Sequence, residues 1–268
     1  MNFESLEGKR GVSVEGDTVV KIQEPGASRK ERLRTQAGRE VGLQTGLFRV
    51  PEIVAFDDSR GQIVFERLLL TGIRECLSQA GRSMDLAGRA AGVLAAIHGR
   101  MTPSDRTGKG DSAAVGVGLA RRTVPLHGDF GMRNIFCMRD SDELVIIDWA
   151  NADWMGVDAD LGAPELDVAV FLISLFHRRM FGPWPVSRRH EVARHFLRTY
   201  ASVSPRGLDV DTLRAVVSAT RPGFNQSTRR GKGYLRALAY RYSMIDLEFF
   251  LRRLSNQDFA GQPNRQRG

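Results

Sequence analysis

The stretch between residues 127 and 149 decides the fold: it opens with His127-Gly-Asp-Phe-Gly-Met-Arg-Asn134 and closes with Ile146-Ile-Asp-Trp149. Two apolar, strand-like runs, Ile135–Met138 and Leu144–Ile147, follow the first motif and lead into the second. Between them lies the turn-forming sequence Arg-Asp-Ser-Asp at positions 139–142. The pattern predicts an antiparallel β-hairpin centred near Ser141.

A hairpin of this kind brings three polar side chains to its open end. Asn134 and Asp148 are each seven residues from the expected centre, and Asp129 lies in the loop just before the first strand. Such oxygen ligands, supplemented by water and phosphate oxygens, are what Mg²⁺ prefers in nucleotide enzymes. Phosphoryl transfer needs mainly positioning and charge neutralisation, so a metal-holding pair and one hydroxyl-orienting carboxylate form a nearly complete catalytic set.

The order His-x-Asp, four further residues, Asn, and then Ile-Asp-Trp resembles the aminoglycoside phosphotransferase and choline kinase branch of the protein kinase-like superfamily. The resemblance implies a two-lobed α+β fold that uses ATP and Mg²⁺. It implies Asp129 as the catalytic base, and Asn134 and Asp148 as magnesium ligands. Asp167, in Asp-Val-Ala, matches the family's Asp-Leu-Ala motif, whose Asp braces the catalytic loop.

The N-terminal region carries weaker parts of the same pattern. Thr18–Lys21 resembles the strand that presents a lysine to the α- and β-phosphates. Glu40, nineteen residues further on and on a predicted helix, is the expected partner of that lysine, and Glu31 is the competing one. Only Gly8 and Gly11 remain of a glycine-rich phosphate loop, and such a pair alone is weak evidence.

Three residues near the motif have open roles. No second His lies near His127, so we expect it to orient the loop backbone instead of binding metal or acting as a base. Arg133 either touches the transferred phosphate or faces solvent, and we take it as a candidate catalytic residue because anion recognition favours Arg. Ala150 stands where many relatives carry an acid, which leaves substrate contacts there undefined.

The rest of the chain divides into a β-rich part and a mainly helical part. We predict an N-lobe over residues 1–70 that binds nucleotide through a β-sheet and one helix over Ser28–Thr45, with Pro25-Gly26 ending the strands before it. A C-lobe over residues 71–268 is predicted to hold the catalytic loop and acceptor-binding helices. Strands followed by helices, without regular alternation, indicate an α+β class.

Composition limits the protein's class. The chain has 268 residues, 42% of them hydrophobic, and its longest apolar runs are about half the ~20 residues of a membrane helix. The N-terminus lacks the apolar stretch of a secretory signal, so we expect a cytoplasmic protein. Cys76 and Cys137 sit in apolar company and are expected to be reduced, buried thiols. The net charge of +8 leaves nucleic acid open as a partner.

The acceptor is predicted to be a small molecule. Only seventeen residues separate Asp148 from Glu165, which leaves little room for a peptide platform of the protein kinase type. Asp153, Asp158 and Asp160 are candidates for the substrate mouth. The basic stretches behind them, Arg178–Arg206 and Arg221–Arg253, favour an anionic acceptor if they wall that site.

Two other functions stay open at this point. One is a nucleotide-binding regulator that kept the fold but does little catalysis, which only the degenerate glycine loop supports. The other is an atypical kinase associated with nucleic acid or protein. The sequence does not indicate an oligomeric state.

Overall fold

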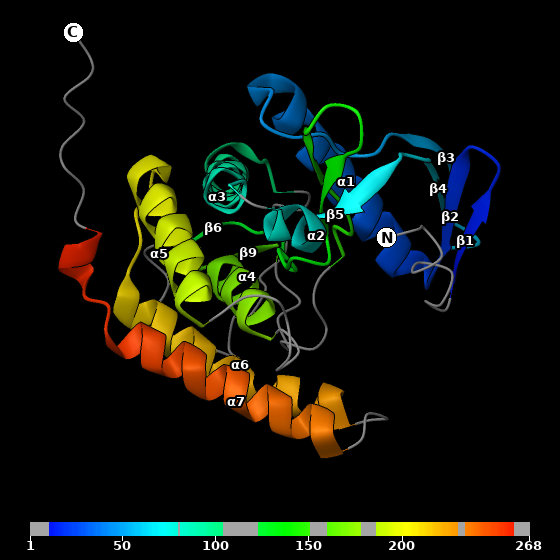
Figure 1. Ribbon diagram of the computed structural model, residues 1–268. Coiled ribbons are helices and arrows are strands. Elements are labelled where there is room, and N and C mark those ends of the chain that lie inside the picture. The colour runs from blue at the N-terminus through cyan, green and yellow to red at the C-terminus, as the bar shows by residue number, and fades with distance from the viewer. Residues whose placement is uncertain are drawn as a thin grey trace, which may run out of the picture.

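The computed structural model describes residues 11–79, 81–103, 123–150, 160–177, 186–229 and 234–259. Two hairpins form a four-stranded antiparallel sheet in the order β1-β2-β4-β3, at one end of the molecule (Figure 1). The strands are β1 (Val12–Glu15), β2 (Thr18–Ile22), β3 (Ile53–Asp57) and β4 (Gln62–Glu66). A Cβ at Gly11, where φ is +86°, would lie 2.1 Å from the Ile22 carbonyl oxygen, so the end of the first hairpin requires glycine.

Helix α1 (Pro25–Thr45) follows β2 directly and lies between the four-stranded sheet and the rest of the molecule (Figure 1). The expected start at Ser28 was three residues late, because Pro25 begins the helix instead of ending the strand region. Proline suits the first turn of a helix, where its missing N–H would have no partner. Gly46, at φ +64°, ends the helix and donates its N–H to the Gly42 carbonyl.

The predicted hairpin is present as β7 (Ile135–Met138) and β8 (Leu144–Ile146), and β5 (Leu70–Gly72) pairs with β7 to make a three-stranded sheet. Its register differs from the prediction by one position, since Ile135 faces Ile146 and the Ile147 N–H donates to the Asn134 carbonyl. A four-residue loop lies between Met138 and Glu143, so the centre falls between two residues and not on one. Asp148 therefore lies one residue past Asn134's partner.

The helical part contains α2 (Ile73–Ser78), α3 (Ser83–Arg100), α4 (Glu165–Phe176), α5 (Val186–Val203), α6 (Val210–Arg229) and α7 (Tyr234–Arg252), followed by a short 3₁₀ helix (Asn256–Asp258). Strand β6 (Val124–Pro125), just before the loop of Asp129, pairs over two residues with β9 (Leu161–Gly162), just before α4. Figure 1 shows α6 and α7 side by side along the edge opposite the four-stranded sheet. None of the described helices is long and apolar enough to cross a bilayer.

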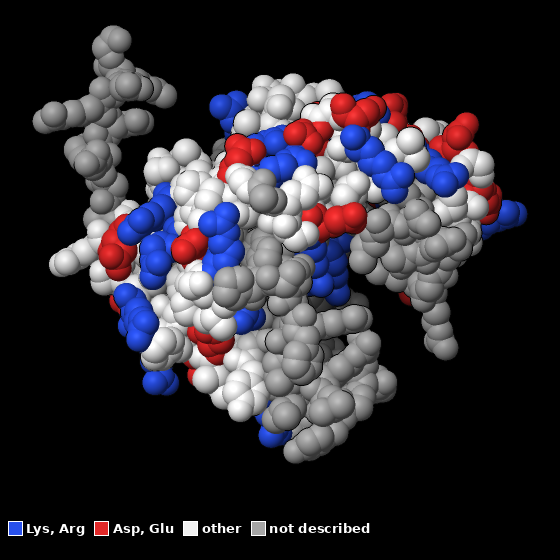
Figure 2. All heavy atoms as spheres, in the orientation of Figure 1, with Lys and Arg blue, Asp and Glu red and all other residues white. Residues whose placement is uncertain are grey.

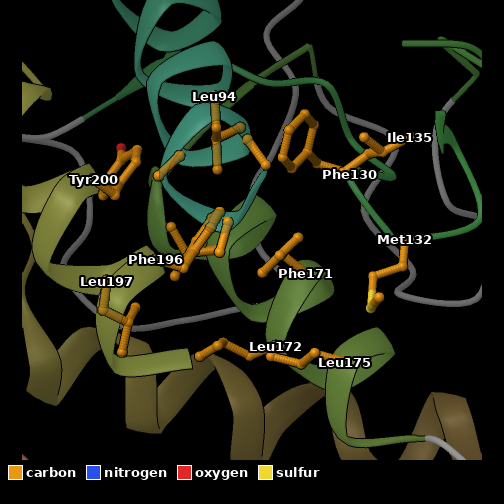
Figure 3. Close-up of a cluster of buried hydrophobic side chains, with 14 of the residues drawn as sticks. Leu94, Phe130, Met132, Ile135, Phe171, Leu172, Leu175, Phe196, Leu197 and Tyr200 are labelled. Carbon is orange, nitrogen blue, oxygen red and sulfur yellow. The ribbon is translucent and has the colours of Figure 1, made fainter. Parts of the chain in front are cut away.

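The main core lies between α3, α4 and α5, and the loop before β7 inserts into it. Every residue of α4 except Ser174 is buried. Phe171 stacks on Phe196 with ring centroids 3.9 Å apart. Phe130 and Met132 of the loop point into the same cluster (Figure 3). The apolar residues beside Asp129 therefore anchor its loop in the core, and the Asp129 and Asn134 side chains are buried with them.

Candidate active site

Asp129 lies in a tight turn between β6 and β7, with only 4% of its surface exposed. Its Oδ2 atom accepts a hydrogen bond from Asn134 Nδ2 at 2.8 Å and one from Arg133 Nε at 3.2 Å. Asn134 Nδ2 also donates to the Asp129 backbone carbonyl at 2.8 Å. The Gly131 N–H donates to that same carbonyl, which closes the turn. The turn thus brings two of the predicted residues, Arg133 and Asn134, to the carboxylate of a third, Asp129.

The environment of Asp129 favours proton uptake. Burial raises the pKa of its carboxyl above the ordinary value, and the nearby Arg133 guanidinium only partly offsets this effect. A carboxylate with a raised pKa is a better proton acceptor near neutral pH. Arg133 forms an ion pair with Asp129. Its side chain is nevertheless 55% exposed, so part of the guanidinium faces solvent.

Asp148 follows the hairpin in a left-handed backbone conformation, with φ at +62°. Such a conformation is uncommon for a residue other than glycine and clusters at functional sites. Its Oδ1 atom accepts a hydrogen bond from Lys21 Nζ at 2.7 Å, although the two residues are 127 positions apart. Strand β2 and the end of the hairpin therefore meet at this ion pair.

Lys21 is paired with Glu31 as well, and not with Glu40. Lys21 Nζ donates to Glu31 Oε1 at 2.8 Å, and Gln23 Nε2 donates to Glu31 Oε2 at 2.7 Å. Burial lowers the pKa of Lys21, but the Glu31 and Asp148 carboxylates more than reverse this, so its pKa is raised. The expected Lys21–Glu40 pair is wrong: Glu40 is exposed, nine residues past Glu31 and about 14 Å further along the helix axis.

Asp167, at the start of α4, holds the backbone of the loop that leads to Asp129. Its Oδ2 accepts the His127 N–H at 2.7 Å and its Oδ1 accepts the Gly128 N–H at 2.9 Å. His98 joins Asp167 Oδ2 (Nε2, 3.1 Å) to the Tyr200 hydroxyl (Nδ1, 2.7 Å). Burial would raise the pKa of Asp167, but its hydrogen bond with His98 and its other partners hold that pKa below the ordinary value.

His127 is a fully buried, neutral part of this loop. Its Nδ1 accepts the Asp129 N–H at 3.2 Å, and its ring packs on Trp149 with centroids 4.5 Å apart. Burial lowers the pKa of His127 to about 4, against an opposing effect of Asp167. A neutral imidazole with its acceptor nitrogen occupied by a backbone N–H is an orienting group, as the sequence predicts.

Arg34 of α1 was missed by sequence reasoning. Its guanidinium is buried and donates to the carbonyls of Leu126 and His127 at 2.7 and 2.8 Å. The one available signal was its spacing of three residues from Glu31, which puts both side chains on one face of α1. The targets of Arg34 are backbone atoms, and these leave no mark in the sequence.

The oxygen atoms at the hairpin end suit a hard divalent cation. Asn134 Oδ1 is buried and has no hydrogen-bond partner among the described residues, which is unusual for an amide oxygen and fits a metal ligand. The Asp148 carboxylate lies at the same end of the hairpin. No group of three or more His, Cys, Asp and Glu side chains in the described ranges could hold a metal ion alone, so water and ligand oxygens would have to complete the coordination.

Some of the predicted residues lie elsewhere. Gly8, Asp153 and Asp158 fall outside the described residues. The carboxylate of Asp160 lies 3.4 Å from Lys30 Nζ and 3.5 Å from Arg34 Nη1, both on α1, and a place for Asp160 at the substrate mouth stays a prediction. Gly11 has the packing role given above, and a phosphate contact there stays a prediction.

Scans against protein-family models found no match. A search among curated proteins also found none. Among solved structures, the chain is similar to a glucosamine kinase in complex with glucosamine, ADP and inorganic phosphate, with a TM-score of 0.58 at 18% identity over 88% of this chain and 78% of that one. A second crystal form of glucosamine kinase gives 0.56 at 17% identity over 89% and 77%.

A GDP complex of an aminoglycoside 2′-phosphotransferase-IIIa mutant matches with a TM-score of 0.50 at 14% identity, over 91% of this chain and 86% of that one. At such low identity the likeness establishes the fold. The chain therefore has the kinase-like α+β fold of these small-molecule phosphotransferases, as the resemblance of residues 127–149 to the aminoglycoside phosphotransferase and choline kinase family implied.

Proposed function

We propose that this protein is a Mg²⁺-dependent phosphotransferase that moves the γ-phosphate of ATP to a hydroxyl of a small molecule. The observation that carries the proposal is the 2.7 Å contact between Lys21 and Asp148, beside the loop that holds Asp129. A lysine on a sheet, a carboxylate after a hairpin and a buried loop carboxylate form the set that phosphoryl transfer requires. In this proposal residues 1–70 bind the nucleotide and residues 71–268 bind the acceptor.

Each residue has a task in this reaction. Asp129 accepts the proton of the acceptor hydroxyl, helped by the raised pKa that its burial gives. Asn134 and Asp148 would hold Mg²⁺, which supplies charge neutralisation for the phosphates when bound. Lys21, held by Glu31, is directed to the α- and β-phosphates. Arg133 keeps part of its guanidinium in solvent, where it can pair with the transferred phosphate.

We propose that the acceptor is a sugar hydroxyl. An amino sugar is the first candidate because a glucosamine kinase shares the fold. The basic helices give less support to an anionic acceptor than their composition indicated. In these stretches Arg189 and His190 pair with Asp246, and Arg188 pairs with Glu191. On the face drawn in Figure 2, Lys and Arg are interspersed with Asp and Glu among the described residues.

The test is ADP release from Mg-ATP with a panel of glucosamine, glucose, an aminoglycoside, ethanolamine and a sugar phosphate. Asp129→Asn should lower the turnover of whichever acceptor is used by about 10²–10⁴-fold, as expected for lost general-base chemistry. Asp140→Asn makes the same exchange in the exposed hairpin turn and should keep full turnover. Full turnover in Asp129→Asn would refute the assignment, and nucleotide binding without turnover of any acceptor would favour the regulatory alternative.

A further inference from the structure

Arg34 makes an unusual set of contacts for a helix arginine. Its side chain is 1% exposed. The Nη2 atom donates to two successive backbone carbonyls, those of Leu126 and His127, which lead into the turn of Asp129. Its Nη1 atom lies 3.5 Å from the Asp160 carboxylate, and the Asp160 carbonyl accepts the Leu126 N–H at 2.9 Å. One guanidinium thus holds the loop and the segment that pairs with it.

The same turn of α1 also holds the nucleotide-side lysine. Glu31 and Arg34 are three residues apart and therefore point from one face of the helix. Glu31 binds Lys21, whereas Arg34 binds the backbone two residues before Asp129. The distance between Lys21 and the Asp129 loop is therefore set through a single helical turn.

The position of α1 itself is fixed from a second side. A Cβ built on Gly38 would lie 2.4 Å from the ring of Trp149, so the indole lies directly against the helix backbone. Trp149 is adjacent to Asp148 and is 1% exposed. Helix α1 thus packs on Trp149 through Gly38. It also holds the loop before Asp129 through Arg34.

We propose that Arg34 is a positioning residue for phosphoryl transfer: it clamps the catalytic loop to α1 and so sets Asp129 at the correct distance from Lys21 and Asp148. The inference rests on the proposed function for its catalytic consequence. Arg34 donates to backbone carbonyls before Asp129 and would act on the reaction through that loop. A displacement of about 1 Å at a reacting group can cost roughly 10²-fold in rate, so loosening this clamp should be visible in turnover.

The test is Arg34→Lys, with Arg39→Lys as the matched control. A lysine keeps the charge but has a single terminal nitrogen, so it cannot place one nitrogen on the two carbonyls and a second beside Asp160 as the guanidinium does. Arg39 is on the same helix, is 40% exposed and pairs only with the exposed Glu52 at 3.2 Å among its described contacts. We expect Arg34→Lys to lower kcat by about 10–100-fold with a change in the nucleotide KM below about 3-fold. Arg39→Lys should match the wild type in both.

Hydrogen–deuterium exchange provides a readout that does not need activity. In Arg34→Lys, amides of residues 126–134 should exchange at least about 10-fold faster, while those of α4 stay protected. Unchanged exchange and unchanged kcat would overturn the inference. So would a lowered melting temperature with normal kcat below it, because Arg34 would then be structural only.

Two further results separate this inference from the proposed function. If the wild type turns over no acceptor, the proposed function fails, while loop exchange in Arg34→Lys still decides whether Arg34 orders the loop. If Arg34→Lys does not fold, Asp160→Asn replaces it. That change removes the carboxylate near Arg34 and should lower kcat in the same direction by about 3–10-fold, and an unchanged kcat there overturns the inference.

Discussion

The buried neutral imidazole of His127 makes stability depend on pH in a way that can be calculated. The pKa of His127 is about 4 in the folded chain against an ordinary 6.5. Below pH 6.5 His127 therefore binds a proton in the unfolded chain but not in the folded one. The free energy of unfolding falls as the pH falls, until about pH 4. One pKa unit corresponds to about 1.4 kcal/mol, so lowering the pH from 7.5 to 5 should cost about 2 kcal/mol through this residue alone.

The assay is urea unfolding of the wild type and of His127→Gln at both pH values, followed by tryptophan fluorescence and circular dichroism. Glutamine keeps a polar group but does not titrate, so the variant should lose about 2 kcal/mol less than the wild type on acidification. His195→Gln makes the same exchange at an exposed position on α5 and should behave as the wild type does. An equal loss in wild type and His127→Gln would refute the reasoning, as would an NMR titration midpoint for His127 near 6.5.

Two other changes test the supports of the loop. Asp167→Asn leaves the hydrogen bond with His98 uncharged and should destabilise the protein by about 3–5 kcal/mol at pH 7. Because the pKa of Asp167 is lowered on folding, its contribution is present above the unfolded pKa and is lost as pH falls through the folded one, so the variant should lose less stability below pH 4 than the wild type in urea unfolding. Gly38→Ala forces a Cβ towards Trp149 and should cost about 1–3 kcal/mol in thermal unfolding. Gly92→Ala on α3 meets nothing within 4 Å and should stabilise by about 0.5–1 kcal/mol, so similar effects from both glycine changes would contradict the packing argument.

The sequence was informative where contacts are local. The hairpin, the turn of Asp129 and its pairing with Asn134 all lie within about twenty residues, and alternation and turn residues specify them directly. The one-residue register error arose because turn residues mark a loop without fixing how many of them it contains. The error is small in space but moves Asp148 beyond the ladder, where it reaches Lys21.

The choice of Glu40 failed for a different reason. Glu31 and Glu40 both lie in the predicted helix, and their spacing from Lys21 does not show which turn of that helix lies beside the end of β2. Because α1 begins at Pro25, its second turn is the one beside the end of β2. Glu31 then follows from geometry, because the lysine cannot also reach Glu40, which lies about two and a half turns further along the axis.

Arginine content was the least readable feature. The basic composition indicated a charged partner, yet several arginines bind backbone atoms of the chain itself. Arg34, Arg89 and Arg214 all donate to backbone carbonyls that lie far away in sequence. A guanidinium offers five donors, so it can bind carbonyls at loop entries and helix ends. No partner side chain is needed for these bonds. The net charge of the sequence does not separate these arginines from those that are free to bind a partner.

The loop that leads to Asp129 is held by two side chains of opposite charge, and each binds one kind of backbone group. The Asp167 carboxylate accepts the N–H groups of His127 and Gly128, and the Arg34 guanidinium donates to the carbonyls of Leu126 and His127. Gly128 adopts φ +80° between them. Glycine takes this conformation without strain, so the turn needs no other residue type there. Because a carboxylate only accepts and a guanidinium only donates, the two supports cannot substitute for each other, and both are needed to keep Asp129 buried and pointed at its neighbours.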